Sequence, residues 1–84
     1  MEKTQIALFN PLKEPLECEI LDDNNQPHTY IIPPIDMAYF EPHIARIMEK
    51  RLIDSIINTR ELGLNDIYNE EVMNEIKKEI HVEL

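Results

Sequence analysis

Residues 42–63, PHIARIMEKRLIDSIINTRELG, decide the fold of this 84-residue chain. Apolar side chains recur in this stretch at spacings of one, three, four and four residues, at Ile44, Ala45, Met48, Leu52 and Ile56. On a helical wheel they cover an arc of about 120°, which is typical of a helix with one face in a core. Pro42 suits the first turn, where its missing N–H costs nothing.

The end of this helix is predicted from Gly63, the only glycine in the chain. A glycine directly after a helical pattern often adopts the left-handed conformation that ends a helix, and Leu64 follows it as the usual apolar contact. The pattern therefore predicts a helix over about residues 42–62.

Three further isoleucines, Ile47, Ile53 and Ile57, lie outside the apolar stripe of this helix. At ~100° per residue, Ile47 lies roughly 60° beyond Ile44, and the other two lie roughly 60–100° beyond Ile56. A small sheet covers the stripe and a second helix covers one flank, so the other flank stays exposed. We predict that Ile47, or the pair Ile53 and Ile57, contacts another chain.

A second helix is predicted over about residues 66–80, with its start near Asn65 or Asn69. Asn69 is a good N-cap, and Glu70 and Glu71 complement the positive end of the helix dipole. Its apolar face comprises Val72, Met73, Ile76 and Ile80.

The first forty residues have the pattern of strands. Leu16, Cys18 and Ile20 alternate with Glu17 and Glu19, which places apolar and acidic side chains on opposite faces. The turn-forming run 22–25, DDNN, separates this strand from the β-favouring run 28–32, HTYII, so the two form a hairpin. Residues 5–9 and 35–40 are further short strands.

These patterns predict a single α+β domain over residues 1–84. A small antiparallel sheet of three or four short strands, over about residues 5–40, precedes the two helices. A chain of this size buries only ~60–65% of its unfolded surface, so the core is thin and a partner surface is expected to supply further burial.

No motif indicates catalysis, a cofactor or a metal. The candidate metal ligands Cys18, His28, His43 and His81 lie ten or more residues apart, whereas zinc sites use closely spaced ligand pairs. Ser55 has no evident base nearby. One glycine is too few for a phosphate-binding loop. We expect a protein that is not an enzyme.

The charge is −9 and unevenly distributed. Residues 1–40 carry −5 from two Lys and seven Asp/Glu, residues 41–62 are neutral, and residues 63–84 carry −4 from two Lys and six Asp/Glu. No basic run is long enough to neutralise phosphates, so direct nucleic-acid binding is not expected. The apolar runs are too short for a signal peptide or a membrane span, which predicts a soluble chain made in the cytoplasm.

The runs 9–11, FNP, and 30–34, YIIPP, followed by Phe40, 43–45, HIA, and 52–54, LID, resemble a type of small virion structural protein of tailed bacteriophages. The resemblance covers about residues 6–57. It departs from the type at residues 24–25, NN, where a glycine turn is usual, and at Pro34, where Ala-Gly is common. It implies a location in the virion, in the head or the head–tail neck, and other virion proteins as partners. It carries no catalytic motif.

Three hypotheses remain open. The first is the virion component, present in many copies after synthesis in the host cytoplasm. The second is an acidic inhibitor that occupies a basic or nucleic-acid-binding site of a host protein. The third is a subunit or adaptor domain of a cellular complex. An electrostatic mimic loses affinity steeply with ionic strength, which separates the second hypothesis from the first.

Overall fold

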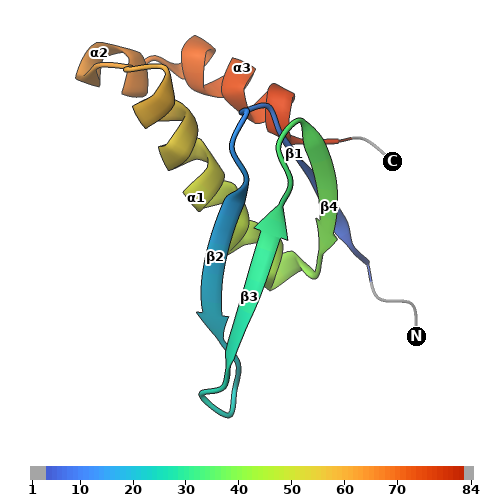
Figure 1. Ribbon diagram of the computed structural model, residues 1–84. Helices are drawn as coiled ribbons and strands as arrows, with labels where there is room; N and C mark the ends of the chain where they lie inside the picture. Colours follow the sequence, from blue (N-terminus) through green and yellow to red (C-terminus); the bar gives the residue numbers. More distant parts are fainter. Residues whose placement is uncertain (1–3, 83–84) are drawn as a thin grey trace.

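The computed structural model describes residues 4–82, in which four strands are followed by helices (Figure 1). The elements are β1 (Ile6–Asn10), β2 (Leu16–Leu21), β3 (Pro27–Ile32), β4 (Asp36–Phe40), α1 (Pro42–Thr59), α2 (Leu64–Ile67) and α3 (Glu70–Ile80). The predicted α+β class, with short antiparallel strands before helices, is confirmed. A single-turn helix, α2, was not predicted. None of the helices within residues 4–82 is long and apolar enough to cross a bilayer.

The strands form two two-stranded sheets rather than one. β2 and β3 are the predicted hairpin, with Cys18 opposite Tyr30. β1 pairs antiparallel with β4, with Phe9 opposite Met37. The chain therefore leaves β1, forms the whole hairpin and returns to pair with its own first strand.

The link between β3 and β4 explains why the hairpin and the second sheet do not merge. Pro33 and Pro34 follow β3 and have no backbone N–H for a ladder. Ile35 then adopts a positive φ of 50°, which turns the chain away from the direction of β3. Its N–H donates to the carbonyl of Leu12 at 3.2 Å, so this turn is held against the β1–β2 loop.

The turn of the hairpin is built as its sequence predicts. Asn25 has a φ of 60°, and one carboxylate oxygen of Asp22 accepts hydrogen bonds from the N–H groups of Asn24 and Gln26 at 2.8 and 2.9 Å. The backbone N–H of Gln26, followed by the ring of His28 at 2.8 Å, lowers the pKa of Asp22 below its ordinary value. The turn therefore favours an ionised carboxylate.

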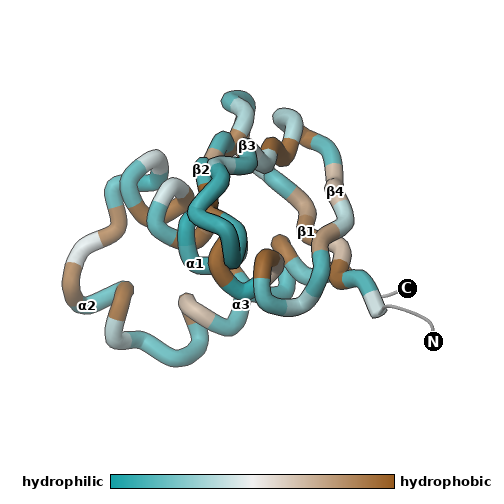
Figure 2. Tube along the Cα trace, turned by 90° about the horizontal axis from the view of Figure 1, so that it is seen from below, coloured by the Kyte–Doolittle hydropathy of each residue, from teal (hydrophilic) through white to brown (hydrophobic). Residues whose placement is uncertain are grey.

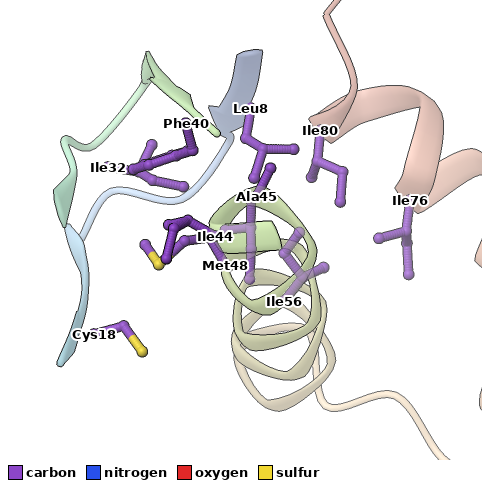
Figure 3. Close-up of a cluster of buried hydrophobic side chains, with 11 residues drawn as sticks. Leu8, Cys18, Ile32, Phe40, Ile44, Ala45, Met48, Ile56, Ile76 and Ile80 are labelled. Carbon is purple, nitrogen blue, oxygen red and sulfur yellow. The ribbon is translucent and has the colours of Figure 1, made fainter. Parts of the chain in front are cut away.

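One cluster of buried side chains joins both sheets to α1 and α3 (Figure 3). All five residues of the predicted α1 stripe are buried, which confirms the face assigned from the sequence. The cluster comprises Leu8, Cys18, Ile32, Phe40, Ile44, Ala45, Met48, Leu52, Ile56, Ile76 and Ile80. The helices cover the inner side of the strands, and the outer side of the strands faces away from this core.

The predicted end of α1 is wrong by three residues. The left-handed residue is Glu61, with a φ of 54°, whereas Gly63 has an ordinary φ of −87°. The N–H of Leu62 donates to the carbonyl of Ile57 at 3.0 Å, and that of Glu61 donates to the carbonyl of Asn58 at 3.3 Å. These two bonds define a Schellman motif, in which Glu61 holds the position that glycine usually occupies.

Leu62 makes the apolar contact that was predicted for Leu64. Leu62 packs against the core cluster, whereas Leu64 is exposed. Gly63 instead precedes α2, and its N–H donates to the carboxylate of Asp66 at 3.2 Å.

This geometry predicts that Glu61→Gly raises the free energy of unfolding by about 1 kcal/mol, because glycine adopts the left-handed conformation without steric cost. Gly63→Ala is the matched comparison. It should change stability by less than about 0.5 kcal/mol, since a Cβ at this position meets nothing within 4 Å. Urea unfolding of both variants measures the difference. If Gly63→Ala lowers the free energy of unfolding by more than about 0.5 kcal/mol and Glu61→Gly does not raise it, the left-handed cap of α1 lies at Gly63 instead.

The predicted start of the second helix near residue 66 is wrong, because α2 ends at Ile67 and α3 begins only at Glu70. The predicted Asn69 cap and the end of α3 agree with the sequence. The side-chain oxygen of Asn69 accepts hydrogen bonds from the N–H groups of Glu71 and Val72 at 2.9 and 3.4 Å. Ile76 and Ile80 are buried, and the helix ends at Ile80 as predicted. Arg60, beyond the end of α1, pairs with Glu79 of α3 at 2.7 Å and ties the two helices together.

Candidate interaction surfaces

The three isoleucines predicted to contact a partner all lie on α1, but they differ in exposure. Ile53 is half-buried against the core cluster, and Ile57 is also half-buried. Ile47 is 39% exposed. The flank of the stripe that stays most open is therefore the Ile47 flank, and contact of these residues with another chain stays a prediction.

Ile47 lies among cations. A shallow open depression on α1 is lined by Ile47 together with Arg46, Lys50, Arg51 and Asp54. Three of the eight Lys and Arg residues of the chain lie here beside a single carboxylate. This part of α1 is therefore locally positive, although the protein has a net charge of −9. We name these five residues the α1 patch. An apolar side chain surrounded by cations fits a partner that offers an apolar group beside carboxylates.

A second exposed apolar surface lies on the strands and was not predicted. Met37 and Tyr39 alternate with the inward-facing Ala38 and Phe40 along β4, and they are 38% and 50% exposed. Phe9 lies opposite Met37 on β1 and is only partly buried, outside the core cluster.

Two further isoleucines of the strand region are also exposed. Ile31 alternates with buried Ile32 on β3 and is 48% exposed, and Ile35 directly precedes β4 and is 58% exposed. We name Phe9, Ile31, Ile35, Met37 and Tyr39 the outer strand face. The solvated side of an antiparallel sheet is usually polar, and β2 obeys this rule with Glu17 and Glu19. β4 breaks the rule, and exposed apolar surfaces of this kind are often interaction sites.

Ile35 has a backbone conformation that its side chain disfavours. A positive φ is rare for residues other than glycine, and it is a genuine outlier for a β-branched residue. Such a conformation costs about 1–3 kcal/mol. The exposed side chain recovers little of this cost by burial in its own chain.

The sequence gives only a weak indication of the outer strand face. Residues 36–40, DMAYF, place apolar side chains on both faces of the strand, so the alternation of apolar and polar residues that identifies a half-buried strand is missing there. The positive φ of Ile35 depends on how the chain is routed between two sheets, which no local pattern encodes.

The residues considered as metal ligands are dispersed. Cys18 is buried on β2, His28 bonds to Asp22 at the hairpin turn, and His81 lies 3.3 Å from Glu49. His43 lies at the first turn of α1, 3.8 Å from Glu41. Among the side chains that the structure describes, no three of the types His, Cys, Asp or Glu are arranged to hold a metal ion.

No protein-family model, no curated protein and no solved structure matches this chain.

Proposed function

We propose that this chain is a non-enzymatic structural protein of the virion of a tailed bacteriophage. It is present in many copies in the head or the head–tail neck, and it binds neighbouring virion proteins through the outer strand face and the α1 patch. The resemblance of residues 6–57 to small virion proteins supplies the class. The exposed apolar surfaces supply the mode of action.

The observation that carries the proposal is Ile35. Its side chain is 58% exposed while its backbone holds a costly left-handed conformation. Within its own chain, glycine or asparagine at this position is the more stable choice. An exposed isoleucine at such a position is accounted for when a second protein buries it, because burial of apolar area stabilises a complex.

The arrangement of the two surfaces supports assembly into a larger structure. The outer strand face belongs to β1, β3 and β4, whereas the α1 patch lies on a helix that packs against the inner side of the strands (Figure 1). A chain with two separate surfaces is able to bridge two neighbours. A component repeated in a shell or a ring needs this property.

The inhibitor alternative gains no support from the charge geometry. A mimic of nucleic acid needs carboxylates along one continuous face. Here Glu17 and Glu19 lie on β2, and Glu70, Glu71 and Glu75 lie on α3. α1 lies between β2 and α3 in both views, and it carries the positive α1 patch (Figures 1 and 2).

The proposal is tested by Ile35→Gly. Glycine relieves the backbone strain, so the free energy of unfolding of the isolated chain should hold or rise by up to about 1 kcal/mol. Incorporation of the variant into particles is measured in competition with the wild-type chain. It should fall at least tenfold, because an apolar side chain that fills a pocket of the partner contributes about 1.4 kcal/mol or more to the binding free energy.

Leu21→Ser is the matched control. Leu21 is also 58% exposed but lies at the other end of the hairpin, beside its turn. It should incorporate like the wild type. Normal incorporation of Ile35→Gly, or an equal loss with Leu21→Ser, would remove the outer strand face from the assembly.

A further inference from the structure

The outer edge of β2 has no partner strand among the described residues. β2 pairs with β3 alone, and no described strand lies along its other edge (Figure 1). The N–H of Asp22 donates to the carbonyl of Gln26 at 3.0 Å, which fixes the pattern of the hairpin. Bonded and non-bonded pairs alternate along antiparallel strands. The backbone N–H and C=O groups of Glu17 and Glu19 therefore point away from β3, toward the open edge.

A groove runs between this edge and α1. It has a volume of about 410 Å³ and is lined on the strand side by residues 16–19 and on the helix side by Arg51, Asp54, Ser55 and Asn58. A smaller hollow of about 160 Å³ continues it past Leu16 along Ser55 and Asn58 toward the loop that precedes β2. The groove thus follows the strand direction.

One side of α1 forms the far wall of the groove. Residues 51, 54–55 and 58 follow one another at helical spacing, so a single side of α1 forms the wall. Cys18 lines the groove, and its largely buried thiol lies 4.0 Å from the carbonyl oxygen of Glu19. That carbonyl belongs to the open edge, where an added strand would donate a hydrogen bond.

The charge at the groove is negative. Glu17, Glu19 and Asp54 oppose one cation, Arg51. Glu17 and Glu19 project from the same outer side of β2, two residues apart, so they would lie beside alternate residues of an added strand. Opposite charges at such cross-strand positions stabilise pairing.

We infer that the open edge of β2 binds an extended peptide segment with Lys or Arg at alternate positions. The segment adds as a further strand, through backbone hydrogen bonds at Glu17 and Glu19. Its basic side chains lie beside these two glutamates, and the intervening side chains face Cys18 and the α1 wall. The groove shares Arg51 and Asp54 with the α1 patch. The inference does not rest on the virion proposal, because it depends on backbone pairing at the open edge of β2.

The probe is a capped synthetic peptide as long as β2 that alternates Lys and Val. Its binding is measured by calorimetry and by the rate at which a thiol reagent modifies Cys18, the only cysteine in the chain. Binding in the groove should slow this modification in proportion to occupancy. The same peptide with N-methyl groups on the amides that face β2 keeps its charge but loses the backbone donors, so it should neither bind nor protect Cys18.

A pair of double variants tests the role of charge. Glu17→Gln with Glu19→Gln should weaken binding about 2- to 30-fold, as expected for the loss of two cross-strand ion pairs. Glu71→Gln with Glu75→Gln makes the same change in net charge on exposed positions of α3 and should leave binding unchanged.

Three results would overturn the inference. They are no binding of the alternating peptide, equal binding of the N-methylated peptide, and equal weakening by both double variants. Equal binding of the N-methylated peptide, or equal weakening by both double variants, would mean that the peptide binds only by general attraction between its positive charge and the acidic protein. Failure of the virion proposal would leave these measurements unaffected.

Discussion

Leu52→Ala should lower the free energy of unfolding by about 2–5 kcal/mol, the range measured for large-to-small changes in protein cores. Leu52 is fully buried at the middle of the α1 stripe, and α1 is the element that both sheets and α3 share. The substitution removes apolar contacts and leaves a cavity that a small core closes only in part. Domains have total stabilities of about 5–15 kcal/mol, so this variant loses a large share of its stability.

Ile47→Ala on the same helix is the control for Leu52→Ala. It removes an aliphatic side chain of similar size from a position that is 39% exposed, so the loss should be much smaller. Denaturant unfolding of both variants gives the comparison. A loss of less than about 2 kcal/mol for Leu52→Ala would mean that α1 presents a different face to the core.

Asn10→Asp should cost about 3–5 kcal/mol at neutral pH, because it places an uncompensated charge in the interior. Asn10 is fully buried. Its amide N–H₂ group donates to the carbonyls of Glu14 and Ile32 at 2.8 and 3.2 Å, and its side-chain oxygen accepts from the N–H of Leu12 at 3.0 Å. The change replaces the donor by a carboxylate oxygen that faces two carbonyl oxygens.

The cost of Asn10→Asp should depend on pH. Burial and the two carbonyl acceptors favour the protonated form, so they raise the pKa of the introduced carboxyl above its ordinary value of about 3.9. A raised pKa in the folded state means that the native protein binds the proton more tightly. The variant is therefore least destabilised below about pH 4, and it loses stability as the pH rises through the raised pKa.

Asn10→Ala separates the two effects. It removes the same hydrogen bonds but introduces no titratable group, so its cost should be independent of pH between the acidic and neutral ranges. Unfolding curves at several pH values measure both variants. A cost of Asn10→Asp that does not grow with pH would show that the side chain reaches water.

The sequence predicted the elements whose determinants are local. The α1 stripe, the DDNN turn with left-handed Asn25, and the cap formed by Asn69 are set by side chains within one or two turns of backbone. Each of these features is determined by residues close together in the sequence. A short sequence pattern is therefore enough to predict it.

The helix end shows where local reasoning fails. The sequence predicts Gly63 as the left-handed residue because glycine adopts that conformation freely, yet Glu61 holds it and Gly63 has an ordinary φ. At the observed end of α1, Leu62 packs partly buried against the core and Arg60 pairs with Glu79 of α3. These tertiary contacts outweigh the conformational preference of a single residue.

The outer strand face and the split of the sheet depend on contacts between distant segments. Pairing of β1 with β4 spans the whole hairpin, and the Asn10 side chain links β1 to the carbonyl of Ile32. From the sequence, Asn10 is predicted only to end a strand. Its buried hydrogen bonds between the two sheets become apparent only in the folded structure.

Quantitative mass spectrometry of purified particles tests the central claim most directly. The particles are those produced from the genome that encodes the chain, washed at high salt to remove proteins that adhere by charge alone. The account predicts many copies of the chain per particle, retained through the wash. Abundant chain in the lysate of producing cells, with none in the washed particles, would contradict the virion role.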